Sequence, residues 1–278
     1  MLKIDSHQHF WKYDPNRDAW ITDNMSVIKK DFLPEDLEPV LQANGIHGCV
    51  VVQSVQSEAE NHFQLQNAEK YNFIKGVVGW VGLTASDVEE KLNYYAQYKK
   101  IKGFRHVLQG EPQRDYMLRP DFLKGISLLN KFNFTYDILV YPDQLKFIKE
   151  MIIKFPEQRF VIDHLAKPYI KDKILIEWAE DMMALSKFEN VFCKISGMVT
   201  ETSWKQWTLD EFDPYIDVVL QSFGIDRVMF GSDWPVCQLS ATYDQVYEIV
   251  NNYFASYSES EQQKIFGENA IKFYSLSE

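Results

Sequence analysis

The stretch from residue 48 to residue 81, GCVVVQSVQSEAENHFQLQNAEKYNFIKGVVGWV, holds two short apolar runs separated by a longer segment of mixed polarity. Residues 48–53 and 74–81 are rich in β-branched side chains and predict buried strands, whereas residues 57–71 have the periodicity of a helix. A strand, a helix and a second strand in this order predict a parallel β/α unit and argue against a β-sandwich.

The same alternation continues along the whole chain. Further strand-like runs cover residues 2–6, 101–106, 134–140, 159–164, 190–196 and 227–233. Further helices are predicted at 34–44, 86–98, 121–132, 142–155, 172–188, 210–223 and 243–255. Ser86 and Glu89 form a capping-box pattern at the start of one helix, and a last helix is predicted at about 258–275, packed outside the barrel. Eight strand-like runs predict an α/β fold, namely a single (β/α)8 TIM barrel.

The size and charge of the chain narrow the class of protein. Its 278 residues suit one barrel of roughly 250 residues, so we expect a single domain over residues 1–278. A net charge of −11 without a Lys/Arg cluster argues against nucleic acid as a partner. The sequence shows neither a signal-peptide pattern nor a run of about 18 apolar residues, so we expect no membrane contact and a cytoplasmic location. The three cysteines, Cys49, Cys193 and Cys237, are expected to be reduced thiols.

Four ionisable side chains stand at the ends of predicted strands. His7 and His9 follow the first strand, His164 ends the sixth and Asp233 ends the eighth. Two histidines spaced by two on an extended segment lie on the same face. Because catalytic groups of β/α barrels project from the carboxyl ends of the strands, we expect these four side chains to meet at one rim and to form the catalytic site.

Other side chains near strand ends are candidates for substrate binding. Arg105 offers a fork of donors that suits oxyanions, although a structural ion pair is the alternative for this residue. The other polar candidates could be solvated, and the aromatic candidates could simply pack in the core. The remaining substrate-binding candidates are His106, Lys167, Lys194, Trp80 and Trp234, with Trp11 and Tyr141 as further apolar walls.

The sequence motifs at the strand ends resemble those of one family. The strings DSHQHFW, GFRHVLQGEP, VIDHLAKP, KISGM and FGSDWPV resemble the amidohydrolase superfamily, amidohydrolase 2 type, and within it the hydrolases of L-fuconolactonase, L-rhamnonolactonase and 2-pyrone-4,6-dicarboxylate lactonase kind. The resemblance implies an enzyme that opens a small-molecule lactone, most readily a sugar 1,4- or 1,5-lactone. Asp233 would then act as the general base toward water.

The chain also departs from the superfamily's two-metal members. Arg105 and His106 stand where those members have a lysine at strand four, and Asp137 stands at strand five in place of a histidine. We therefore expect no two-metal centre. Two versions stay open: one divalent ion such as Zn²⁺ held by His7, His9, His164 and Asp233, or a reaction without metal.

Two other functions are compatible with the same residues. A zinc-dependent decarboxylase of the aminocarboxymuconate-semialdehyde type shares the fold and these positions, and a binding protein on a barrel that has lost its activity is the alternative from another class. The expected partner is in every case a small molecule. The oligomeric state is left open, with a homodimer as one option.

Overall fold

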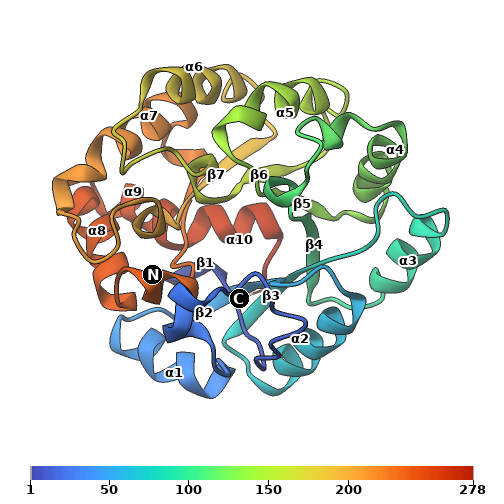
Figure 1. Ribbon diagram of the computed structural model, residues 1–278, viewed down its shortest axis with the longest axis horizontal. Coiled ribbons are helices and arrows are strands. Elements are labelled where there is room, and N and C mark those ends of the chain that lie inside the picture. The colour runs from blue at the N-terminus through green and yellow to red at the C-terminus, as the bar shows by residue number, and fades with distance from the viewer. Residues whose placement is uncertain (1, 278) are drawn as a thin grey trace.

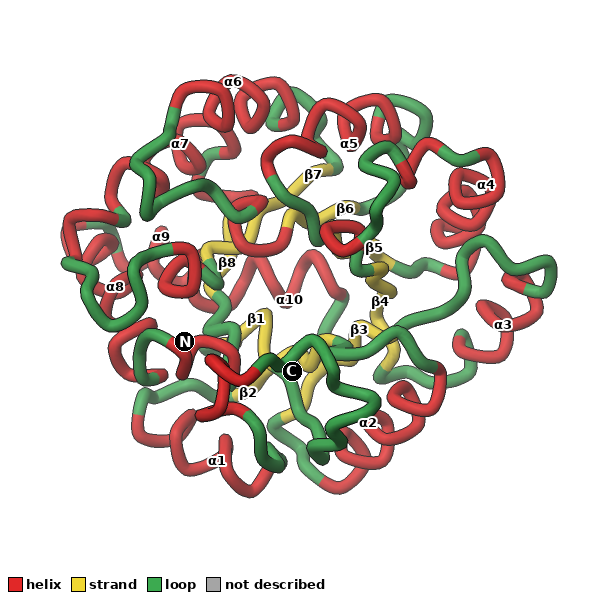
Figure 2. The backbone as a smooth tube through the Cα atoms, in the orientation of Figure 1, coloured by secondary structure: helices red, strands yellow, loops and turns green. Residues whose placement is uncertain are grey.

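The computed structural model describes residues 2–277, and its eight strands pair in parallel, each with the next along the chain. Figure 2 shows these strands as a central ring with the helices outside it. The strands are β1 (Ile4–Gln8), β2 (Gly48–Val52), β3 (Ile74–Gly79), β4 (Ile101–His106), β5 (Thr135–Ile138), β6 (Phe160–Ile162), β7 (Val191–Ile195) and β8 (Val228–Phe230).

The ring closes between β8 and β1. Gln8 and Trp234 form a parallel bridge, and the backbone N–H of His9 donates to the carbonyl of Trp234 at 2.7 Å. The N–H of Asp233 donates to the carbonyl of His7 at 2.8 Å. The predicted (β/α)8 barrel is thereby confirmed, and its closure ties the segment carrying two histidines directly to the segment carrying Asp233.

Amphipathic helices cover the outside of the ring (Figure 1). In α5 the side chains of Leu145, Ile148 and Ile152 are buried against the barrel, and each contributes about 1.5–3 kcal/mol of apolar burial. The helices are α1 (Pro34–Ala43), α2 (Glu58–Lys70), α3 (Val88–Tyr95), α4 (Pro120–Leu129), α5 (Leu145–Ile152), α6 (Ile176–Leu185), α7 (Asp213–Phe223), α8 (Tyr243–Tyr253), α9 (Glu259–Gln263) and α10 (Asn269–Tyr274). Within the described residues, no helix is both long enough and apolar enough to span a bilayer.

The last helix, α10, covers the amino-terminal end of the barrel. Figures 1 and 2 show it crossing the centre of the ring. The Asn269 side chain donates to the carbonyl of Val228, where β8 begins, and Phe273 and Tyr274 are 1% exposed. These side chains join an apolar cluster with the inward-facing residues of the strands, including Ile4, Val50, Val78, Val161 and Met229. The tail predicted as one helix consists of α9, a π-helical turn and α10.

Several predicted boundaries differ from those of the structure, two of them at the starts of elements. The helix expected to start at a Ser86 capping box begins at Val88 instead, with Asp87 at the N-cap position and no side-chain cap. The first strand covers Ile4–Gln8 and not 2–6, because Ile4 pairs with Gly48 at the start of β2. The second shift places His7 inside the strand, where its side chain faces the barrel interior and is fully buried.

Candidate active site

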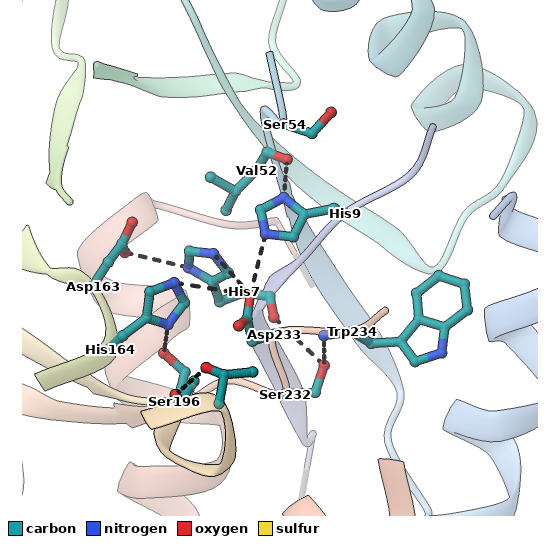
Figure 3. Close-up of polar contacts among 12 residues, drawn as sticks. His7, His9, Val52, Ser54, Asp163, His164, Ser196, Ser232, Asp233 and Trp234 are labelled. Carbon is teal, nitrogen blue, oxygen red and sulfur yellow. Dashed lines mark hydrogen bonds and ion pairs between the residues drawn. The ribbon is translucent and has the colours of Figure 1, made fainter. Parts of the chain in front are cut away.

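The structure brings together the four ionisable residues predicted at the strand ends (Figure 3). His7 lies in β1 and His9 directly after it, while His164 follows β6 and Asp233 follows β8. All four are at most 4% exposed. Because parallel strands of a barrel end at the same rim, residues more than 200 positions apart in the chain share one buried cluster.

The three imidazole rings face one oxygen atom of Asp233. Its Oδ1 lies 3.3 Å from Nε2 of His9, 3.8 Å from Nε2 of His164 and 3.9 Å from Nε2 of His7. In Figure 3 the rings surround this carboxylate. The arrangement concentrates three nitrogen atoms and one oxygen atom around a single point.

The other nitrogen of each ring is held by a neighbouring group, which fixes the ring orientation. His9 Nδ1 is 2.7 Å from the carbonyl oxygen of Val52. Because a carbonyl only accepts, this Nδ1 carries a hydrogen, and the role of Nε2 toward Asp233 depends on whether the ring holds a second proton. Two acceptors 3.3 Å apart repel each other unless a proton or a cation lies between them. The matching Nδ1 partners are Ser196 Oγ at 2.8 Å for His164 and Asp163 Oδ1 at 3.3 Å for His7.

Left-handed backbone delivers two of the four side chains. Asp233 has φ +58°, and four consecutive residues from His164 to Lys167 have φ between +53° and +58°. Such a turn costs roughly 1–2 kcal/mol for each residue other than glycine, and strain of this kind is concentrated at functional sites. Gly197 is required beside it, since a Cβ there would lie 2.5 Å from Nδ1 of His164.

The local electrostatics favour neutral histidines and an ionised carboxylate. Burial holds the pKa of His164 well below its ordinary value, and burial together with the nearby Lys194 does the same to the pKa of His7. Burial alone would raise the pKa of Asp233, but His164 and the contact with His9 outweigh it and lower this pKa. Asp233 is therefore available as a proton acceptor at neutral pH.

The donor set fits one divalent metal ion. Potential ligand atoms of His7, His164 and Asp233 all lie within 4.8 Å of one another, and all three residues are buried. Imidazole nitrogen and carboxylate oxygen are ordinary zinc ligands, which stand about 3.4 Å apart around a tetrahedral ion. His9 lies outside this tightest set, although its Nε2 is in contact with the same oxygen of Asp233.

Two predicted substrate-binding residues lie beneath the histidines. Arg105 Nη1 pairs with Asp163 Oδ2 at 3.0 Å and lies 3.3 Å from Nε2 of His7. Lys194 is fully buried, and its Nζ is 2.9 Å from Asp163 Oδ1 and 2.6 Å from Asp137 Oδ2. Lys194 thus contacts other site residues from inside the barrel, with its side chain shielded from solvent. Burial raises the pKa of Asp137 to about 6.

A second predicted pair forms a separate cluster. The indole N–H of Trp80 donates to Nδ1 of His106 at 3.4 Å, and Nε2 of His106 is 2.7 Å from Glu111. The imidazole also stacks on Tyr116, with 5.3 Å between ring centroids. Both nitrogens of His106 are therefore engaged by partners outside the four-residue cluster.

Lys167 stands closer to the cluster, on the left-handed turn that carries His164. Its Nζ is 3.3 Å from Glu201 and 5.8 Å from the ring centroid of Tyr141, and the side chain is 17% exposed. By contrast, the indole of Trp234 is directed away from the histidines and packs on Phe32 at 5.2 Å between centroids (Figure 3). Trp11 donates its indole N–H to the carbonyl of Lys30 and stacks edge-on with Phe32.

Sequence reasoning missed the residues that support the histidines. Asp163 contacts His7, and Ser196 contacts His164. Asp5 accepts backbone N–H groups of both His7 and Ser232 through one oxygen. The available signal was a charged residue inside an otherwise apolar strand, because a buried charge needs a partner.

The barrel and its His/Asp cluster define a hydrolase-type site of the amidohydrolase class, and comparison with known proteins agrees. The sequence pattern of the amidohydrolase family matches residues 4–276, so the chain belongs to this family. It is 35% identical to an L-fucono-1,5-lactonase of Burkholderia multivorans over 290 residues, which cover 100% of this chain and 97% of the relative.

Solved structures agree with this assignment. An amidohydrolase from Burkholderia multivorans with bound zinc superimposes with a TM-score of 0.96 at 35% identity, with 100% of both chains covered. A 5-carboxyvanillate decarboxylase of Novosphingobium aromaticivorans, complexed with manganese, reaches a TM-score of 0.73 at 15% identity, over 99% of this chain and 96% of the other. At that identity the likeness to the decarboxylase shows the fold alone. The predicted family is therefore confirmed, with the lactonases as the similar members.

Proposed function

We propose that this protein hydrolyses a sugar lactone, of the L-fucono-1,5-lactone type, to the open hydroxy acid. The observation that carries the proposal is Asp233 Oδ1, an ionised acceptor surrounded by three imidazole Nε2 atoms. Full-length similarity to an L-fucono-1,5-lactonase supports the substrate class. The chain is proposed to act as one domain in the cytoplasm, where its three buried, unpaired cysteines would stay reduced.

We propose that His7, His164 and Asp233 hold one zinc ion, with His9 beside them. When bound, the ion would supply a Lewis acid for the lactone carbonyl and would lower the pKa of a coordinated water. The buried set of ring nitrogens and one carboxylate oxygen supports this version over direct polarisation by the histidines, because these groups are ordinary zinc ligands. The zinc-bound relative supports the same choice.

The residues of the chain divide the remaining work. Asp233 accepts the proton of the attacking water and later returns it to the ring oxygen that leaves as an alkoxide. Val52 and Ser196 keep the rings of His9 and His164 in place during the reaction. Lys167 binds hydroxyl or carboxylate oxygens of the sugar at the mouth of the barrel, since its ammonium is partly exposed on the turn that carries His164.

The test is acid release from a panel of sugar lactones, followed with a pH indicator. The protein is assayed as purified, after chelation, and after zinc is restored, with metal content measured in each state. Turnover of an aldonolactone that is lost when zinc is removed and recovered when zinc is restored supports the proposal. Turnover that persists without metal would overturn the zinc part alone. Release of carbon dioxide from an aromatic carboxylate, without lactone turnover, would favour the decarboxylase.

A further inference from the structure

We infer that Tyr274, on the helix that closes the far end of the barrel, is a positioning residue for His7. The contact is indirect and runs through the barrel interior. It joins the last helix of the chain to the first histidine of the site. The kinetic part of this inference rests on the proposed lactone hydrolysis, whereas its spectroscopic part does not.

Three consecutive polar contacts connect the two residues. The hydroxyl of Tyr274 donates to Asp137 Oδ2 at 2.6 Å. Lys194 Nζ donates to the same oxygen at 2.6 Å and lies 3.1 Å from Nδ1 of His7. Every residue of this chain of contacts is at most 1% exposed, so water cannot replace any of its members.

Lys194 is the member whose position matters most. Its ammonium lies between the carboxylates of Asp137 and Asp163 and beside Nδ1 of His7. The position of the ammonium therefore depends on its attraction to the two carboxylates and on its contact with the imidazole. Tyr274 takes part of the hydrogen-bonding capacity of Asp137 and so limits how strongly this carboxylate attracts Lys194.

The ring and the hydroxyl of Tyr274 have separable roles. The ring packs with Phe273 at 4.8 Å between centroids and lies 5.5 Å from Lys194 Nζ, which phenylalanine could reproduce. Only the hydroxyl reaches Asp137. A residue that served packing alone would not need the hydroxyl. Among the described residues, Asp137 is the hydrogen-bond partner of this hydroxyl at the amino-terminal end of the barrel.

The experiment compares Tyr274→Phe with two controls. Tyr95→Phe removes another buried tyrosine hydroxyl, one that donates to Glu58 on the outside of the barrel. Phe273→Leu loosens the same helix without touching the polar contacts. For each variant, kcat and KM on the lactone, thermal unfolding, and the ¹⁵N signals of the histidine rings are measured. The His7 signals are assigned with His7→Gln.

We expect Tyr274→Phe to lower kcat by about tenfold with KM unchanged. This is the lower end of the effect seen when an outer partner of a ligating side chain is removed. The ring-nitrogen signals of His7 should shift in Tyr274→Phe and stay in place in both controls. Wild-type kcat and unmoved His7 signals in Tyr274→Phe would overturn the inference, as would an equal loss of kcat in Phe273→Leu. Shifted His7 signals in a protein that turns over no lactone would leave the inference standing and overturn the proposed function.

Discussion

The two ends of this barrel treat buried charge in opposite ways. Below the histidines, Lys194 is paired with the carboxylates of Asp137 and Asp163, and α10 seals the end with apolar side chains and one hydroxyl. At the carboxyl end, Asp233 Oδ1 faces three ring nitrogens at 3.3–3.9 Å. A buried charge that is paired with an opposite charge stabilises the fold, whereas a buried charge that still requires a partner indicates a reactive site.

This comparison predicts that the same kind of substitution has different effects at the two ends. A change at the carboxyl end should reduce turnover while the protein stays folded. A change beneath it should reduce the free energy of unfolding, because a broken buried pair leaves an uncompensated charge.

The largest effect is expected for Asp233→Asn. We expect kcat to fall by about 10⁴-fold, the upper end for general-base catalysis, because the same carboxylate is also a proposed metal ligand. The amide keeps the shape, so thermal unfolding should change little. Asp226→Asn, at an exposed pair with Lys264, is the matched control and should have wild-type turnover. Steady-state kinetics with circular dichroism decide the question, and an active Asp233→Asn protein would exclude this residue as the base.

Lys194→Met tests the other side of the comparison. Removing the cation leaves Asp137 and Asp163 buried without it, so the free energy of unfolding should drop by about 3–5 kcal/mol in urea titration. The exposed pair of Lys131 and Glu89 supplies the control, since Lys131→Met should cost less than about 1 kcal/mol. Equal losses in the two variants would mean that the buried cluster is not what stabilises the interior.

A smaller effect is expected for Phe273→Leu in α10. The side chain is 1% exposed within the cluster that covers the amino-terminal end. A hydrophobic exchange of this kind should cost about 1 kcal/mol of unfolding free energy and leave kcat within about twofold. Thermal unfolding and kinetics on one preparation measure both quantities. A large loss of kcat here would make the amino-terminal end part of the catalytic machinery through packing alone.

The smallest effect is expected for Lys167→Gln at the mouth. This cation is partly exposed and already paired with Glu201, so its loss should raise KM about fivefold, roughly 1 kcal/mol, with kcat maintained. Lys171→Gln, on the exposed segment that follows, serves as the control. An unchanged KM would remove Lys167 from the substrate-binding residues and leave it as a surface ion pair.

Sequence reasoning predicted the fold and the clustering of the ionisable side chains for the same physical reason. Strand runs alternating with helices leave few topologies, and a barrel topology brings strand ends to one rim, so His7, His164 and Asp233 could be placed together from their positions alone. The depth of a side chain could not be placed in this way. Lys194 was expected near the substrate, yet it points into the barrel below His7, because strand tilt and register decide the level at which a residue stands.

Contacts made by the tail were beyond sequence reasoning altogether. The pattern at the chain end predicted a helix, but not that Tyr274 would reach Asp137, 137 positions away. Such a contact depends on how the helix docks, and local periodicity carries no information about docking. The left-handed turn at His164 was equally invisible, since Leu, Ala and Lys, which continue it, are not residues that favour positive φ.

That turn also determines which substitutions the chain can accept. Leu165 and Ala166 have positive φ and are fully buried in the apolar core, so glycine would relieve the backbone strain but would lose the packing of the Leu165 side chain. Valine, isoleucine and threonine could not replace either residue, because a branched Cβ is excluded from this region of backbone space. A library randomised at these two positions would therefore be depleted of β-branched residues as well as of polar ones, because backbone handedness and burial both restrict the accepted side chains.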